Sequence, residues 1–200
     1  DALPISVLLK ASSTNCLYVK GLEVMARACR KLGKDDEASE WRERAESLRN
    51  AIKKELLFED GTLAYYKDRH GKLEERREAL GAALSVLFGI LEGEAACKVL
   101  DDYPVSDAGV ALIHPFYEDE RFYHNNSAWP FVDTFFLWAW EQATDQDRTA
   151  ENAALLGRTC AADGSFHELV NYKTKEIAGS AHQLWSAAGF INVCKRAGFV

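Results

Sequence analysis

The sequence has no excess of positive charge and no long apolar run. Its 24 Lys and Arg residues are outnumbered by 31 Asp and Glu residues, which gives a net charge of −7 at pH 7. Without a dense basic patch, this balance argues against nucleic acid or an anionic membrane as a partner. No apolar stretch of about 18 residues escapes polar interruption, and no basic leader with an apolar centre is present. We therefore expect a soluble chain without a membrane span, either cytoplasmic or periplasmic.

Regular cysteine and histidine patterns are also missing. The chain has five cysteines, an odd number, and they are widely spaced: Cys16, Cys29, Cys97, Cys160 and Cys194. This pattern predicts buried thiols, and neither a disulfide framework nor a zinc site. The spacings of His124, His167 and His182 match no metal-binding motif. We expect no metal and no cofactor.

What the chain does have is helical periodicity. Two hundred residues, 48% of them hydrophobic, suit one domain with a sizeable core. Four segments are apolar on nearly every side, as buried helices are: residues 13–33, 78–91, 126–140 and 180–197. Three segments between them are apolar on one face only: residues 35–56, 92–101 and 145–162. This alternation predicts a concentric double ring of helices, an all-α toroid, whereas a TPR-like solenoid would repeat about every 34 residues.

Local signals predict where two of the buried helices begin. Asn126 or Ser127 can cap the third one, whose first turn tolerates Pro130 because the missing N–H has no partner there. Ser180 can cap the fourth. The long loop at residues 103–123 is of a kind that is often functional.

The main candidate for chemistry is Glu168. It follows an Asp163-Gly164 turn that resembles an earlier one at Asp60-Gly61, and it precedes Gln183 and Trp185. A carboxylate handles protons, an amide binds hydroxyl groups, and an indole covers the apolar face of a pyranose, so this group suits a sugar site. The alternative is a surface glutamate beside a core tryptophan.

Two sequence blocks carry a family resemblance. One is Tyr123-His124-Asn125-Asn126-Ser127-Ala128-Trp129-Pro130; the other is Phe166-His167-Glu168, followed by Thr174, Gly179 and Gln183-Leu184-Trp185-Ser186. Together they resemble the C-terminal half of the six-hairpin glycosidases, most closely glycoside hydrolase family 63 and mannosylglycerate-hydrolase-like (α/α)6 domains. The resemblance covers most of residues 11–199. It departs from the family at residues 169–172, at Lys175 and at His124-Asn125, which leaves the substrate open.

The resemblance implies an incomplete (α/α)6 toroid, about seven of its twelve helices, with short hairpins in the loops at one end. It also implies an inverting hydrolase that acts on an α-linked glycoside or oligosaccharide, with Glu168 as the general base. Substrate binding would involve His124, Asn126, Trp129, His182, Gln183 and Trp185. The general acid would lie upstream of Asp1.

The chain starts without Met, and Asp1–Ile5 can be encoded by a sequencing-adapter end. We therefore expect residues 1–10 to be a non-native or linker start. Residues 11–200 would be the C-terminal part of a catalytic domain, inactive without its missing N-terminal part. Two alternatives stay open: a non-catalytic helical-hairpin module that binds carbohydrate or protein, and an (α/α)6 isomerase or lyase. An upstream Asp placed opposite Glu168 would favour the hydrolase.

Overall fold

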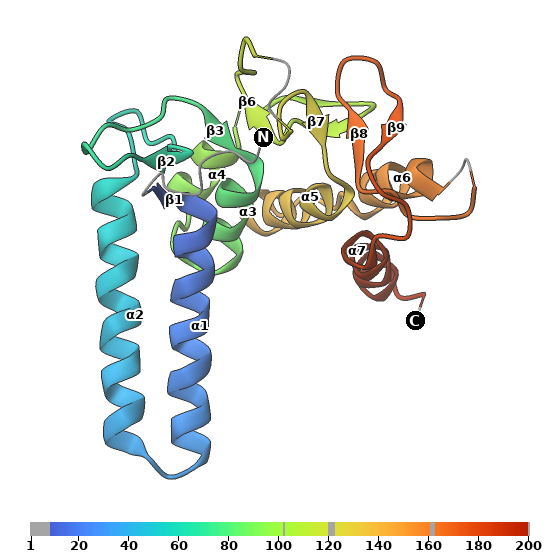
Figure 1. The fold of residues 1–200 in the computed structure, drawn as a ribbon. Coiled ribbons are helices and arrows are strands. Elements are labelled where there is room, and N and C mark those ends of the chain that lie inside the picture. The colour runs from blue at the N-terminus through green and yellow to red at the C-terminus, as the bar shows by residue number, and fades with distance from the viewer. Residues whose placement is uncertain (1–8, 102, 120–122, 161–162, 200) are drawn as a thin grey trace.

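The computed structural model describes residues 9–101, 103–119, 123–160 and 163–199 (Figure 1). These ranges contain seven helices: α1 Ser12–Lys31, α2 Asp35–Glu55, α3 Ala79–Leu87, α4 Glu94–Leu100, α5 Pro130–Thr144, α6 Thr149–Cys160 and α7 Leu184–Arg196. The described part of the chain is therefore all-α in character, as predicted. Within it, no helix is both long enough and apolar enough to cross a membrane.

The strands are only two or three residues long: β1 Lys10–Ala11, β2 Tyr66–Lys67, β3 Arg77–Glu78, β4 Val105–Ser106, β5 Gly109–Val110, β6 Ile113–His114, β7 Ser127–Ala128, β8 Leu169–Asn171 and β9 Ile177–Ala178. They form three antiparallel pairs, β1–β2, β3–β6 and β4–β5, and one three-stranded sheet, β7–β8–β9. Of the predicted non-native start, residues 1–8 lie outside the described ranges, and Lys10 pairs with Lys67.

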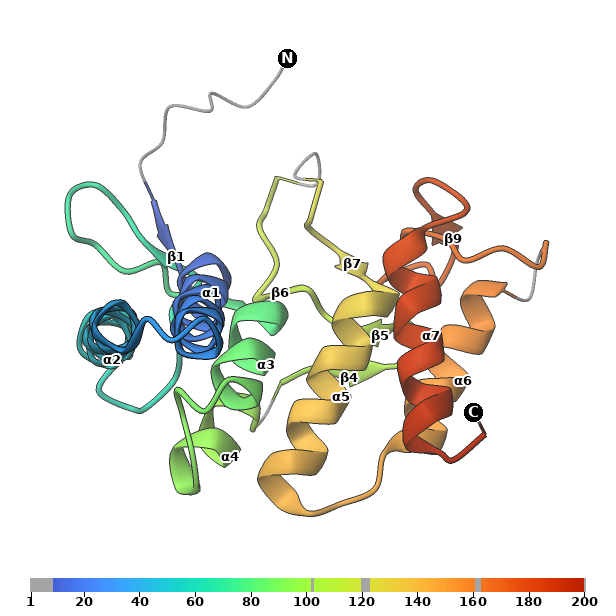
Figure 2. The same cartoon turned by 90° about the horizontal axis from the view of Figure 1, so that it is seen from below.

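The helices are arranged as an arc of alternating inner and outer members. Helices α1, α3, α5 and α7 are consecutive neighbours along the inner row (Figure 2). The outer helix α2 packs on α1, α4 packs on α3 and α5, and α6 packs on α5 and α7. This order is the one that the sequence predicted, and it makes the chain part of an (α/α)6 toroid.

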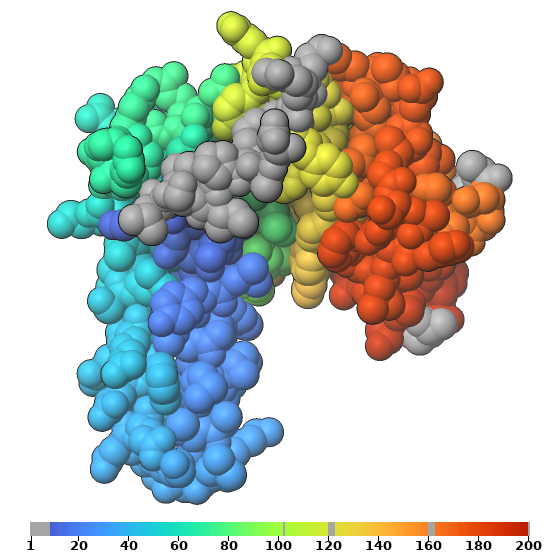
Figure 3. Space-filling view, viewed as in Figure 1, coloured from blue at the N-terminus to red at the C-terminus, as the bar shows by residue number. Residues whose placement is uncertain are grey.

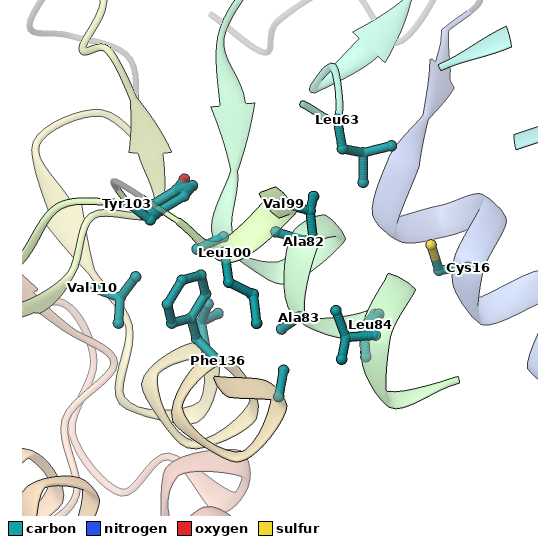
Figure 4. Close-up of a cluster of buried hydrophobic side chains, with 14 of the residues drawn as sticks. Cys16, Leu63, Ala82, Ala83, Leu84, Val99, Leu100, Tyr103, Val110 and Phe136 are labelled. Atoms are coloured by element: carbon teal, nitrogen blue, oxygen red, sulfur yellow. The ribbon is translucent and has the colours of Figure 1, made fainter. Parts of the chain in front are cut away.

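The core lies where the inner helices meet the outer ones. It combines Cys16 from α1, Leu84 from α3, Leu100 from α4 and Phe136 from α5 (Figure 4). Every residue from Pro130 to Trp140 is buried or half-buried, as predicted for an inner helix. The outer helix α2 instead buries one stripe at seven-residue spacing, which consists of Ala38, Ala45 and Ile52.

Small side chains let neighbouring inner helices come close together. A Cβ added at Gly81 of α3 would collide with the hydroxyl of Ser12 on α1. A Cβ at Gly189 of α7 would come within 2.8 Å of Thr134 Oγ1 on α5. Both glycines therefore lie where a larger residue would push two inner helices apart.

The predicted burial is wrong for the two helices at the ends of the arc. Exposed apolar side chains on α1 are Leu17, Tyr18, Val24 and Met25, and those on α7 are Leu184, Trp185, Phe190 and Ile191. The reason is positional, since α1 and α7 each have an inner neighbour on one side only. Figure 3 shows α1 (blue) and α7 (red) separated by an open recess.

The predicted helix starts also need correction. Helix α1 begins at Ser12, and α5 begins after Trp129 because Ser127 and Ala128 pair with β8. Helix α7 begins at Leu184, with Gln183 as its N-cap, so Ser180 does not cap it. The backbone turns out of helical geometry at His182, which has a φ of 57°.

Two of the thiols predicted to be buried are more accessible. Cys16 and Cys29 are buried, whereas Cys97 is exposed and Cys194 is half-buried. Helix α4 buries Ala96, Val99 and Leu100, and Cys97 lies beside this stripe, where its Sγ donates to Ala143 O of α5 at 3.3 Å. The side chain of Cys160 lies outside what the structure describes.

Each inner helix begins directly after a strand or the loop that follows one. Strand β1 leads into α1, β3 into α3 and β7 into α5, and the loop after β9 leads into α7. The hairpins therefore gather at the N-terminal ends of the inner helices, on the upper side of the arc in Figure 1, as the resemblance implied. We call this side the hairpin end of the arc. Side chains on these loops can meet although they are distant in the sequence.

A buried carboxyl group lies in the first turn of α5. Asp133 is almost fully buried, and its Oδ1 accepts a hydrogen bond of 2.7 Å from the backbone N–H of Val110. Burial raises the pKa of Asp133 to about 8, although the bond from Val110 opposes this shift. The group therefore stays protonated in the folded protein at neutral pH.

We predict that Asp133→Asn stabilises the protein at alkaline pH. Because the folded-state pKa is raised, the stability that Asp133 contributes is fully present below about pH 4, its unfolded pKa. That stability is lost as pH rises towards about 8. Asn keeps the acceptor for Val110 and cannot ionise. At pH 9 the variant should be more stable by about 1–3 kcal/mol, measured by urea unfolding, with the difference shrinking at pH 5.

The exposed Asp107→Asn variant is the control, and its stability should follow that of the parent protein at both pH values. Equal pH profiles for Asp133→Asn and the unmodified chain would contradict the prediction.

Candidate active site

The segment before Glu168 is shaped by a tight turn. Asp163 Oδ1 accepts a hydrogen bond of 2.9 Å from Ser165 N, and Gly164 takes a φ of 72°. The earlier Asp60-Gly61 turn is built in the same way, with Thr62 N donating to Asp60 Oδ1 at 2.9 Å. In both turns the Asp side chain binds the backbone two residues on and Gly supplies the positive φ, as predicted.

Glu168 is held where this segment runs beside the loop before α7. Its backbone N–H donates to Ser180 O at 3.0 Å, and Gln183 N donates to Phe166 O at 2.8 Å. Immediately after Glu168, β8 pairs with both β7 and β9. Glu168 therefore lies at the end of a small sheet, at the hairpin end of the arc.

The carboxylate of Glu168 is fixed through one of its oxygens. Tyr123 Oη donates to Oε2 at 2.6 Å, and Ser180 N donates to the same atom at 3.1 Å. Gly179 lies against the carboxylate at a φ of 76°, and a Cβ there would come within 2.7 Å of Oε2. The hydrogen bond to Glu168 raises the pKa of Tyr123 to about 12, so the phenol remains a donor at neutral pH.

A series of aromatic rings extends from this carboxylate. Tyr123 contacts Trp129 edge-to-face, with ring centroids 5.8 Å apart, and His124 lies 5.4 Å from Trp129. Trp185 follows, 6.2 Å from Trp129 and 5.6 Å from Phe131. Trp129 is only 7% exposed and donates its Nε1–H to Ser127, whereas Trp185 is 45% exposed. Trp185 is therefore the more accessible of these two indoles in this chain.

His124 is half-buried between Tyr123 and Trp129. Burial lowers its pKa below the ordinary value, and the negative charge of Glu168 opposes this shift only in part. The imidazole is therefore neutral at pH 7 and presents a polar ring within an aromatic surface.

Three other residues of the predicted site have different partners. The Asn126 side chain is buried at a φ of 51°, and its Oδ1 has no hydrogen-bond partner in the described part of the chain. His182 Nδ1 lies 2.8 Å from the hydroxyl of Ser165. For Gln183 the bond to Phe166 is made by its backbone. Among the described residues, no hydrogen bond or ring contact joins these three to Glu168.

The structure thus brings together Glu168, His124, Trp129 and Trp185, and it adds two residues that the site prediction omitted. Tyr123 stands in a motif block of the sequence, yet its bond to Glu168 spans 45 positions and has no local signal. Gly179 could have been suspected, because a glycine before a helix often marks positive φ or a close approach.

Chemically, the site offers an anchored carboxylate and, at the far end of the ring series that begins with Tyr123, an exposed indole. A carboxylate can take a proton from water, and an indole face can stack on the apolar side of a sugar ring. The arc of inner and outer helices defines the fold class, an incomplete (α/α)6 toroid.

The family assignment is more specific. The profile of the mannosylglycerate hydrolase MGH1-like glycoside hydrolase domain matches residues 6–186. The chain belongs to this family, which confirms the resemblance seen in the sequence. A comparison with curated protein sequences gives no match.

Solved structures of glycosidases share the fold. A sialidase matches with a TM-score of 0.76 and 14% identity over 96% of this chain and 20% of its own. A glycosidase variant in complex with glucose matches with a TM-score of 0.70 and 18% identity over 96% of this chain and 53% of its own. The family 78 rhamnosidase of Bacillus sp. GL1 matches with a TM-score of 0.62 and 18% identity over 90% of this chain and 19% of its own. The chain therefore spans 19–53% of the length of these structures.

We predict that Gly179→Ala destabilises the protein more than Gly164→Ala does. Both glycines have nearly the same positive φ, 76° and 72°, so both variants should lose about 1–2 kcal/mol from backbone strain. A Cβ at position 164 meets no atom within 4 Å, whereas one at 179 collides with Glu168. The collision should lower the free energy of unfolding of Gly179→Ala by about 1–3 kcal/mol more, as measured by urea unfolding. Equal losses in the two variants would show that Gly179 does not constrain the carboxylate.

Proposed function

We propose that residues 11–200 form the C-terminal part of an (α/α)6 catalytic domain that hydrolyses an α-linked glycoside or oligosaccharide with inversion. Glu168 is the general base. The observation that carries this proposal is the anchored carboxylate of Glu168 at the hairpin end of the arc. The rings of Tyr123 and Trp129 connect it to the exposed Trp185. Membership of a glycoside hydrolase domain family supports the reaction class.

In this reaction Glu168 removes a proton from a water molecule, whose oxygen attacks the anomeric carbon on the face opposite the leaving group. The leaving oxygen takes a proton from a general acid roughly 6.5–9.5 Å from the base, a separation that leaves room for the water. The acid is an Asp in sequence upstream of residue 1. The substrate is a carbohydrate, with Trp185 and His124 on the surface that receives it.

The ends of the arc support the proposal of an incomplete ring. Leu17 and Val24 of α1 are exposed, and so are Leu184 and Ile191 of α7. An inner helix of a closed ring has neighbours on both sides, so such faces are covered there by further inner helices. The upstream part of the domain is therefore the partner of these two faces.

We predict that Glu168→Gln lowers turnover by several orders of magnitude in the full-length protein and leaves sugar binding largely intact. Gln keeps the size of the side chain and cannot accept the proton, so kcat should fall by about 10²–10⁴-fold. The assay measures initial rates on aryl α-glucosides and α-mannosides, with the anomer of the first-formed product identified by NMR. Inversion requires a β product.

The control is Glu176→Gln, which changes an exposed carboxylate nearby on the β8–β9 turn and should leave the rate unchanged. The isolated chain should be inactive. An unimpaired Glu168→Gln protein, or full activity in the isolated chain, would overturn the assignment of the base; sugar binding without hydrolysis by the full-length protein would favour the non-catalytic module.

We predict opposite effects of polar substitutions at the open faces in the isolated chain and in the full-length protein. Val24→Lys and Ile191→Lys should reduce aggregation of the isolated chain, because they break exposed apolar surface. In the full-length protein the same changes bury a charge and should lower the melting temperature. The control is Ser47→Lys, on the exposed side of α2, which should change neither the aggregation of the isolated chain nor the melting temperature of the full-length protein. Light scattering and thermal unfolding measure the two effects, and unchanged stability of both full-length variants would contradict the closed ring.

A further inference from the structure

The two oxygens of the Glu168 carboxylate differ in their surroundings. Oε2 accepts both hydrogen bonds, from Tyr123 Oη at 2.6 Å and from Ser180 N at 3.1 Å. For Oε1 the described part of the chain provides no hydrogen-bond donor. A carboxylate bound in this way presents one occupied and one available oxygen.

Tyr123 is the donor that can be removed without disturbing the backbone. Tyr123 is 55% exposed as a residue, yet its ring is kept in place by edge-to-face contact with Trp129 and by a tilted contact with His124, whose ring centroid is 5.5 Å away. The hydroxyl therefore reaches Glu168 from a ring that is already oriented. Phe at this position would keep both ring contacts and lose only the hydroxyl.

We propose that Tyr123 is a positioning residue for the general base: its hydroxyl holds Oε2 of Glu168, so that Oε1 takes the proton from the attacking water. This inference rests on the proposed function of Glu168. Tyr123 acts through the carboxylate, and the Ser180 amide and the wall at Gly179 restrict the carboxylate from the other side.

The consequence concerns the rate more than the affinity for sugar. Without the phenol, the carboxylate can rotate about its remaining bond from Ser180, and the water is less often in line with the anomeric carbon. Misplacement by about 1 Å can cost up to about 100-fold in rate. We expect Tyr123→Phe in the full-length protein to lower kcat by about 10–100-fold, with KM within about twofold of the unmodified value.

A Glu168→Ala background distinguishes positioning from direct contact with the sugar. In this variant, azide can replace the activated water as the nucleophile. The azide nitrogen bonds to the anomeric carbon as the glycosidic bond breaks, and the leaving oxygen takes its proton from the general acid. The product is a glycosyl azide of inverted configuration. If Tyr123 acts only through the carboxylate, Tyr123→Phe should change this azide-dependent rate by less than about twofold.

The experiment compares Tyr123→Phe in the presence of Glu168 and in the Glu168→Ala background with azide. The control is Tyr172→Phe, which removes a hydroxyl directly after β8 and should leave kcat and KM unchanged. An equal loss in both backgrounds, a loss confined to KM, or an unchanged kcat would overturn the positioning role. An unimpaired Glu168→Gln protein would instead overturn the base itself, so the two failures are distinguishable.

Discussion

The close contact between neighbouring inner helices is the constraint on which the rest of the structure depends. Gly81 against Ser12 and Gly189 against Thr134 allow α1 to approach α3 and α7 to approach α5. Helices packed so closely side by side must place their connections beyond the ends of the helices. Since every inner helix begins at the hairpin end, the sheets β1–β2, β3–β6 and β7–β8–β9 all gather there, and that is where Glu168 and Tyr123 meet.

Much of the architecture could be predicted from periodicity. Segments apolar on all sides proved to be the inner helices, and those with a single apolar stripe proved to be outer ones, because burial on every side and burial on one side select different residues. Helix starts were harder to predict. Ser180 has the chemistry of a cap, but its backbone pairs with Glu168, and the positive φ of His182 delays α7 until Leu184. A local signal cannot reveal a competing partner twelve positions away.

The error at α1 and α7 has a different cause. Leu17, Val24 and Ile191 belong to helices whose sequence suits burial on all sides, yet each helix ends the arc and has one face uncovered. Apolar periodicity shows which faces of a helix suit burial, and it does not show whether a neighbour covers each face. Apolar periodicity therefore predicted inner helices correctly while overstating their burial here.

The site shows the same division between local and distant information. Glu168 stands out as a candidate in the sequence because a motif block surrounds it, whereas its bond from Tyr123 joins two loops that the fold alone brings together. The orientation of the carboxylate comes from atoms on other segments: a phenol from the loop before β7, an amide from the loop before α7, and a glycine without a Cβ. Each of these segments enters or precedes an inner helix. The packing of the inner row therefore sets the geometry of the carboxylate, so a change between α5 and α7 should reach Glu168 through the start of α7 without touching it.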